Sequence, residues 1–240
     1  MAAARLPNEV PAPAGDGLRL AEATPSNPKD GGLQVIFVLE QASLELGKIG
    51  KTYQLLNSDE HANFLRRHKK DPADYRPDIL HQELLAILDS PLNKAGHIER
   101  IYVHTKSNAL LSIHPQVRLP RTFKRFCGLM LQLLQKLSIR ATNGSDKLLK
   151  VVKQPVTKYF PPNARRVGFS VSAPDVCDLR TWSENLEKDR AVVFVVGAMA
   201  HGKIDVSWTD ELISISNYPL SGACCIGRIC NALEQKLDIL

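Results

Sequence analysis

An unbroken apolar run near the C-terminus constrains the fold more than any other feature. Residues 192–196 are all Val or Phe, the run ends at Gly197, and a second glycine follows at Gly202. Such a run is typical of a strand buried on both faces, as in a parallel sheet, and the glycines predict a tight loop. A second β-rich run, residues 212–215, leads into another loop. Because ligands bind at the carboxyl ends of parallel strands, we expect the two loops to form the walls of one pocket.

The rest of the chain alternates between strand and helix patterns. Residues 33–39 predict a first buried strand, and residues 101–105 and 110–114 predict a hairpin or two neighbouring strands. A helix is expected after Arg76-Pro77-Asp78, with Asp78 as its N-cap, and a last helix is expected over residues 221–237. This alternation indicates an α/β fold with a mostly parallel sheet flanked by helices.

Composition sets the outer limits of the domain. Residues 1–32 are rich in Ala, Pro and Gly and poor in large apolar side chains, so they predict a disordered tail before one domain over residues 33–240. No apolar stretch reaches 18 residues, and the five cysteines form no Cys-x-x-Cys pair. We therefore expect a soluble, intracellular protein with no membrane contact and no metal site. The net charge of +6 permits a polyanionic partner.

A basic helix is the second informative stretch. Thr122 is its expected N-cap, and an apolar stripe that ends with Leu137 is expected to pack inward. Arg118, Arg121 and Arg125 lie around its start, with no acidic residue close by in the sequence. Helix N-termini attract phosphates, so these arginines predict a phosphate-binding surface. An ordinary solvated basic face is the alternative that the pattern leaves open.

The glycine loop has a rival interpretation. The string from Gly197 to Gly202-Lys203 resembles a phosphate-binding loop that follows a strand. Ile204, however, has no hydroxyl group for magnesium, and too few residues follow it for the strand–helix repeats that such a fold needs. The spacing also predicts no Ser/His/Asp or Cys/His arrangement and no paired carboxylates. The residues therefore nominate no general base, and the catalytic residues stay unassigned.

Several strings in order carry a family resemblance. They are LDSPLNKAG at 88–96, PRTFKRFCGLM at 120–130, LLQKLSIR at 133–140, VVGAMAHGK at 195–203 and ISISNYPLS at 213–221. They resemble the eukaryotic ribosome-biogenesis pseudouridine N1-methyltransferases of the SPOUT superfamily. The resemblance runs from about residue 33 to residue 240, and blocks in a shared order are far more specific than one glycine motif.

The resemblance implies a SPOUT fold with a C-terminal trefoil knot, a homodimer, and S-adenosylmethionine held in the knot. The glycine loop, the loop after the second β-rich run and a residue on the preceding strand would bind the cofactor. Carried over by motif, the implied cofactor-binding residues are Val167, Gly197, Gly202, Ile215, Ser216, Asn217, Tyr218, Pro219 and Leu220.

The resemblance also implies an RNA substrate. Arg76, Arg118, Arg121 and Arg125 would contact a stem-loop of 18S ribosomal RNA, with Asp78 holding Arg76 in place. The implied reaction is methylation of N1 of a pseudouridine, in pre-ribosomal particles with small-subunit assembly factors. The implied location is the nucleolus, within the nucleus, and also the cytoplasm. Two alternatives stay open: a non-catalytic assembly factor that binds pre-ribosomal RNA, and a SPOUT ribose 2′-O-methyltransferase.

Overall fold

The computed structural model describes residues 32–141 and 146–240, so all but the last residue of the expected tail, 1–32, lies outside the described residues. The strands are β1 Val35–Ala42, β2 Leu46–Ile49, β3 Thr52–Leu55, β4 Ile98–Thr105, β5 Leu110–Ile113, β6 Ser138–Arg140, β7 Lys147–Val152, β8 Arg165–Phe169, β9 Val192–Gly197 and β10 Glu211–Ile213. The α-helices are α1 Ser58–Arg67, α2 Pro77–Asp89, α3 Pro91–Lys94, α4 Phe123–Lys136, α5 Leu179–Glu184 and α6 Gly222–Lys236. The 3₁₀ turns are η1 Pro72–Asp74 and η2 Val156–Tyr159.

The main sheet confirms the α/β prediction. Its order in the described part of the chain is β10-β8-β9-β1-β4-β5-β7-β6. The strands from β10 to β4 run parallel to one another, whereas β5, β7 and β6 are added by antiparallel pairing. The expected hairpin is the β4–β5 pair. A mostly parallel centre therefore carries a short antiparallel extension at one edge.

The central pair, β1 and β9, is fully internal to the sheet. Val35 pairs with Val192, and the register continues to Glu40 opposite Gly197. The Ala198 amide donates a 2.7 Å hydrogen bond to the Glu40 carbonyl, so the pairing extends just past the end of β9. Helices and loops cover both faces of these strands, which explains why the sequence of β9 is an uninterrupted apolar run rather than an alternating one.

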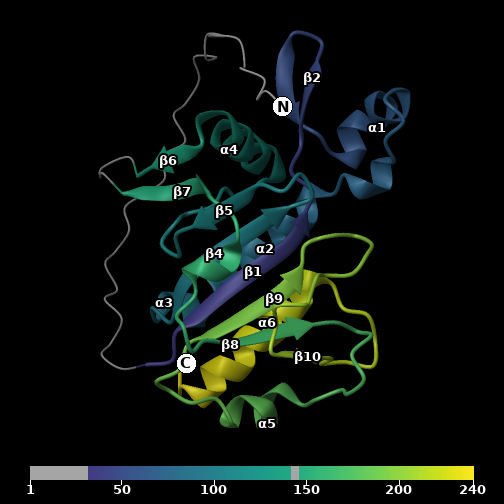
Figure 1. Cartoon of the computed structure of the whole chain (residues 1–240). Helices are drawn as coiled ribbons and strands as arrows, with labels where there is room; N and C mark the ends of the chain where they lie inside the picture. The colour runs from purple at the N-terminus through teal and green to yellow at the C-terminus, as the bar shows by residue number, and fades with distance from the viewer. Residues whose placement is uncertain (1–31, 142–145) are drawn as a thin grey trace.

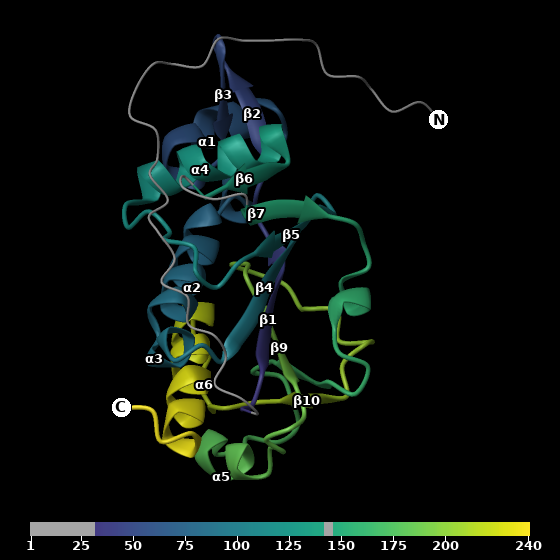
Figure 2. The same cartoon turned by 90° about the vertical axis from the view of Figure 1, so that its left-hand side faces the viewer.

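Helices cover one face of the sheet and loops cover the other. Figure 2 shows α2, α3 and α6 together on one side of the strands, with η2 and long connections on the opposite side. The helical side holds the larger core, which includes the ring pair Phe37 and Phe194, 5.7 Å apart at their centroids. On the other side Val193 and Val195 pack with Tyr102 in a smaller core. Figure 1 shows the β2–β3 hairpin, α1 and α4 at the opposite end of the molecule from α5.

The basic helix α4 packs inward with the expected apolar stripe, Phe123, Phe126, Cys127, Met130 and Leu134, except at its end. Its fully buried side chains are Phe126, Leu129, Met130 and Leu133. Leu137 was expected to be buried, but it is 58% exposed. The reason is that Leu137 ends the helix in the left-handed region, with φ 61°, so it no longer follows the helical stripe.

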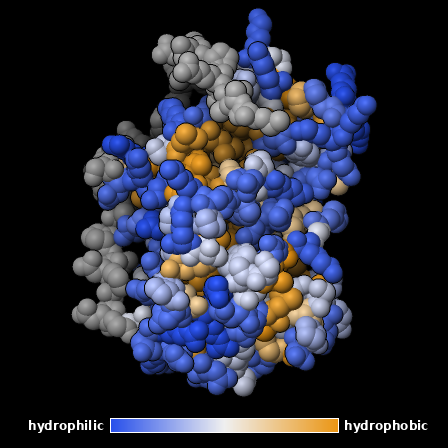
Figure 3. Space-filling view, in the orientation of Figure 1, coloured by the Kyte–Doolittle hydropathy of each residue, from blue (hydrophilic) through white to orange (hydrophobic). Residues whose placement is uncertain are grey.

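The described ranges contain no helix long and apolar enough to cross a membrane. Figure 3 shows one face of the molecule as mostly hydrophilic, with smaller apolar patches between the polar groups.

One buried carboxyl group lies where α2 packs against α6. Glu83 is 0% exposed, and neither of its carboxylate oxygens has a hydrogen-bond partner among the described residues. A Cβ added to Gly222, the first residue of α6, would overlap Glu83 Oε1, so the two helices approach closely only because this position is glycine. Burial raises the pKa of Glu83 to about 9, so the group is neutral at pH 7.

We predict that Glu83 makes stability fall as pH rises. Above pH 4.5 the unfolded chain releases a proton that the folded chain keeps until about pH 9, so the free energy of unfolding decreases across that window. Glu83→Gln removes this loss. In urea titrations from pH 6 to pH 8, the free energy of unfolding of the wild type should fall by about 2.7 kcal/mol relative to that of the variant, at about 1.36 kcal/mol per pH unit. Parallel pH curves for the two proteins would contradict a neutral buried Glu83.

Candidate functional site

One cavity of about 540 Å³ lies at the carboxyl ends of β8, β9 and β10. The loop after β9 and the loop after β10 both line it, as expected for two walls of one pocket. Of the residues that the sequence assigns to a cofactor, those that line the cavity are Gly197, Gly202, Ile215, Ser216, Tyr218, Pro219 and Leu220. The cavity has the size of a typical small-molecule site.

Val167 and Asn217 do not line this cavity. Val167 is fully buried in β8, in register with Phe194 of β9, and packs in the main core. The same strand reaches the cavity two residues later, because Phe169 and the following Ser170 and Val171 line it. The strand that the resemblance implied thus reaches the cavity, but Val167 itself does not line it. The reason is that side-chain direction depends on the register and on where the strand leaves the sheet.

The backbone of the glycine loop, residues 197–202, is closely packed by neighbouring side chains. A Cβ at Gly197 would lie 3.1 Å from Met199 Cε and 3.2 Å from Ile204 Cγ2, so glycine leaves room for both side chains. Gly202 has φ +117°, a backbone conformation that residues with a side chain rarely adopt. The loop therefore presents backbone at the cavity wall, which suits close contact with a nucleoside.

The loop after β10 is held by short local hydrogen bonds. Ser214 Oγ donates to the Ser216 carbonyl at 2.9 Å, and the Tyr218 amide donates to Ser216 Oγ at 3.0 Å. Ser221 caps α6, since its Oγ accepts from the Cys224 amide at 3.2 Å. These bonds fix a tight turn, and Tyr218 remains 76% exposed at its tip. A pre-formed turn of this kind can bind the edge of a base through its backbone groups.

Helix α2 forms a further wall of the cavity, besides the glycine loop and the loop after β10. Arg76, Ile79 and Gln82 line the cavity, and their spacing of three residues places them on one stripe of the helix. Sequence reasoning identified Arg76 but missed Ile79 and Gln82. Only the arrangement of α2 beside the glycine loop reveals their position.

Asp78 does not cap α2, contrary to the sequence-based expectation. Arg76 occupies the N-cap position without a side-chain capping bond, and Pro77 begins the helix. Asp78 instead accepts two hydrogen bonds from Arg76, Nε to Oδ1 at 2.9 Å and Nη2 to Oδ2 at 2.7 Å. The Arg76 guanidinium lowers the pKa of Asp78, so the pair stays charged at neutral pH. This forked pair orients Arg76 at the cavity, in agreement with the implied positioning role of Asp78.

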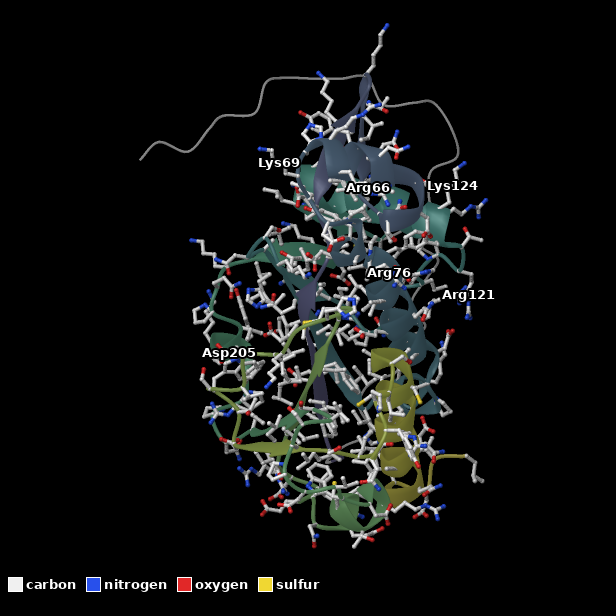
Figure 4. The ribbon with its side chains drawn as sticks, turned by 90° about the vertical axis from the view of Figure 1, so that its right-hand side faces the viewer. Arg66, Lys69, Arg76, Arg121, Lys124 and Asp205 are labelled. Atoms are coloured by element: carbon white, nitrogen blue, oxygen red, sulfur yellow. The ribbon has the colours of Figure 1, made fainter. Side chains whose placement is uncertain are left out.

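A basic segment, residues 118–125, contains the start of α4. His81 on α2 contacts the Pro120 carbonyl through Nε2 at 2.8 Å, which holds this segment beside α2. Arg118, Arg125 and Lys124 are exposed and form no ion pair with the described residues. Figure 4 shows Arg76, Arg121 and Lys124 on one side of the molecule and Asp205 on the other. Because His81 holds Pro120 beside α2, and α2 lines the cavity, the basic surface adjoins the cavity.

Arg121 has an acidic partner, although the sequence places no acidic residue near it. It forms a forked ion pair with Asp89 at the end of α2, with Nη2 to Oδ1 at 3.1 Å. The sequence showed no acidic neighbour because Asp89 lies 32 positions earlier and approaches only through the fold. Arg121 is 73% exposed, so the pair is weak and leaves its guanidinium accessible.

The described residues contain neither a disulfide bond nor a cluster of possible metal ligands. All five cysteines are free. No group of three or more His, Cys, Asp or Glu side chains is arranged to hold a metal ion in the described residues. Burial raises the pKa of Cys225, which lines the cavity, to about 12, so its thiol is not a ready nucleophile at neutral pH.

We predict that the two loop glycines respond differently to alanine. Gly202→Ala places a side chain at φ +117°, so the loop must change shape. Gly197→Ala only displaces the flexible ends of Met199 and Ile204. By calorimetric titration with S-adenosylmethionine, Gly202→Ala should weaken binding at least tenfold, and Gly197→Ala should weaken it less. Equal losses would show that backbone conformation does not set this wall.

Comparison with known proteins gives a family for the chain. Residues 37–234 match the EMG1/NEP1 methyltransferase family. The chain is 52% identical to the ribosomal RNA small subunit methyltransferases NEP1 of Mus musculus and Homo sapiens, over 88% of this chain and 85% of each relative. It is 50% identical to the ribosomal RNA small subunit methyltransferase mra1 of Schizosaccharomyces pombe, over 86% of this chain and 59% of that protein.

A solved structure supports the fold. The crystal structure of Archaeoglobus fulgidus Nep1 bound to S-adenosylhomocysteine superimposes with a TM-score of 0.64 and 22% sequence identity, covering 86% of this chain and 99% of that one. At this identity the likeness shows the shared architecture alone. The family match and the sequence identities carry the assignment: this chain belongs to the EMG1/NEP1 methyltransferase family.

Proposed function

We propose that the protein is an S-adenosylmethionine-dependent methyltransferase that acts on small-subunit ribosomal RNA. One observation carries this function: a single cavity joins the glycine loop and the loop after β10 to Arg76 on α2. A cofactor wall and an RNA-facing wall thus meet in one space. The names of the family relatives, which are small-subunit ribosomal RNA methyltransferases, support the same reaction and substrate.

The residues of the cavity fit S-adenosylmethionine. Gly197 and Gly202 allow close approach of a nucleoside, and the turn held by Ser216 offers backbone groups to an adenine edge. The cofactor, when bound, supplies an activated methyl group on a sulfonium centre. The two loops would hold the cofactor at one wall of the cavity and exclude water. Positioning the reactants and excluding water supply much of the rate enhancement of such a transfer.

The basic segment fits an RNA stem-loop. Arg118, Arg121 and Arg125 surround the start of α4, where Thr122 makes no side-chain capping bond and leaves backbone N–H groups available. Phosphate contacts there would set the register of the RNA, and Arg76 would contact it at the cavity mouth. A base taken out of the stack can then enter the cavity.

We further propose N1 of a pseudouridine in 18S ribosomal RNA as the methyl acceptor. The family resemblance supports this target, as it supports a homodimer, the trefoil knot, small-subunit assembly factors as partners and a nucleolar location. The target nucleotide defines the chemistry, so it is the first of these proposals to test.

We predict methyl transfer to pseudouridine but not to uridine. The substrates are two RNA stem-loops that differ only in having pseudouridine or uridine at one loop position. Uridine has its ribose on N1 and offers no N–H there, so labelled S-adenosylmethionine should label the pseudouridine RNA alone. Nucleoside analysis by mass spectrometry then locates the methyl group on the base. Equal labelling on the ribose of both RNAs would establish 2′-O-methylation, and no labelling of either would favour the non-catalytic assembly factor.

We predict that Asp78→Asn weakens RNA binding without unfolding the protein. The change removes the charged partner of the Arg76 fork, so the guanidinium loses its fixed direction. The Kd for the stem-loop RNA should rise about three- to tenfold, while the unfolding free energy changes by less than about 1 kcal/mol because the pair is partly exposed.

A matched control distinguishes the role of this ion pair from a general loss of charge. Asp210 forms a similar forked pair with Arg166, and neither residue lines the cavity. Asp210→Asn should leave RNA affinity unchanged. If both variants lost affinity equally, net charge rather than the direction of Arg76 would explain the effect.

A further inference from the structure

Gln82 lines the same cavity as the segments that fit the cofactor, but it belongs to a different element, α2. It follows Arg76 and Ile79 on one stripe of α2, and all three residues line the cavity. The glycine loop and the turn around Ser216 line other parts of the same cavity. A base that entered between these walls would have α2 on one side and the methyl donor on the other.

The carboxamide of Gln82 is free to bind a ligand. It is exposed, and it makes no hydrogen bond to the described residues. Several polar side chains at the cavity already have local partners: Arg76 pairs with Asp78, Ser216 accepts from the Tyr218 amide, and Ser221 caps α6. The side chains of His201 and Lys203 and the Tyr218 hydroxyl have no partner among the described residues, but they belong to the two loops that fit the cofactor and not to α2. Gln82 is thus an uncommitted donor and acceptor on the α2 wall.

The chemistry of the base fits a carboxamide at this position. A uracil-type ring presents N3–H and C4=O side by side, and a carboxamide offers a matching acceptor and donor in one plane. In the ring, N1 lies directly across from C4. A base held through its N3–H and C4=O edge by α2 would therefore direct N1 away from α2, toward the glycine loop.

We propose that Gln82 binds the target base through its N3–H and C4=O edge and so turns N1 toward the methyl donor. This inference rests on the proposed function, since it names the base-binding residue of the same site. Uridine and pseudouridine share this edge, so Gln82 orients the base and selects for a uracil-type ring. It does not discriminate between the two nucleosides, because only pseudouridine carries a hydrogen on N1.

The test combines one protein change with one RNA change. Gln82→Ala removes the carboxamide, and N3-methylpseudouridine in the stem-loop removes the N3–H donor. Single-turnover transfer by the wild type should fall about tenfold to hundredfold on the N3-methyl RNA, the size expected for an unpaired polar group. Gln82→Ala should show a similar loss on pseudouridine RNA, and less than about a twofold further loss on the N3-methyl RNA. Losses that multiply, or an unchanged Gln82→Ala rate, would overturn the proposal.

Further variants exclude a merely structural role. Gln82→Glu keeps an acceptor for N3–H but repels C4=O, so it should lose at least as much rate as Gln82→Ala. Affinity for S-adenosylmethionine, measured by calorimetry, should stay within about twofold for Gln82→Ala, because α2 does not form the cofactor wall. Gln135→Ala, an exposed glutamine near the end of α4 that does not line the cavity, should keep the wild-type rate. A loss of cofactor affinity in Gln82→Ala would contradict a base-binding role.

The design also separates this inference from the function beneath it. If the wild type transfers methyl groups to no pseudouridine RNA, the proposed function fails. If the wild type methylates N1 and Gln82→Ala does so equally well, the function stands and only the role of Gln82 is wrong.

Discussion

The contact between α2 and α6 is the constraint on which the cavity depends. Both helices lie on the same face of the parallel strands, and Gly222 lets α6 approach α2 as far as the Glu83 carboxyl group. This approach fixes the distance between the α2 wall and the loops at the carboxyl ends of β9 and β10. A wider spacing would separate Arg76 from the glycine loop, and the two walls would no longer enclose one space.

Helix α2 has a different task on each of its sides. Arg76 and Gln82 face the cavity, His81 holds the basic segment through the Pro120 carbonyl, and Glu83 faces α6. The cost of burying a carboxyl group is limited because Glu83 stays neutral at pH 7. Arg76 stays charged beside Asp78 at the solvent-facing end of the helix. One helix thus places the charged Arg76 and the buried contact with α6 at fixed positions around the same cavity.

Local patterns predicted the parts of the fold that local forces determine. The apolar run of β9 and the glycines after it were sufficient to place the central strand and its loop. They were not sufficient where tertiary contacts decide the outcome. Aspartate is common at helix N-caps, but Asp78 pairs with Arg76 instead. Arg121 forms an ion pair with Asp89, which is brought close only by the packing of α2 and α4. The cofactor and RNA residues came from family resemblance, because spacing alone cannot say which loops meet.

The residues that sequence reasoning missed share a physical cause. Val167 was assigned to the cofactor, whereas its strand reaches the cavity at Phe169, because exposure at a strand end depends on where the neighbouring strands stop. Gln82 is an ordinary exposed helix residue in the sequence, and only the placement of the glycine loop opposite α2 makes it part of a site. The spacing of Arg76, Ile79 and Gln82 predicts that they share one face of α2, but it does not predict which segments that face contacts. The cavity forms only because α2, the glycine loop and the loop after β10, which are far apart in the chain, come together in the fold.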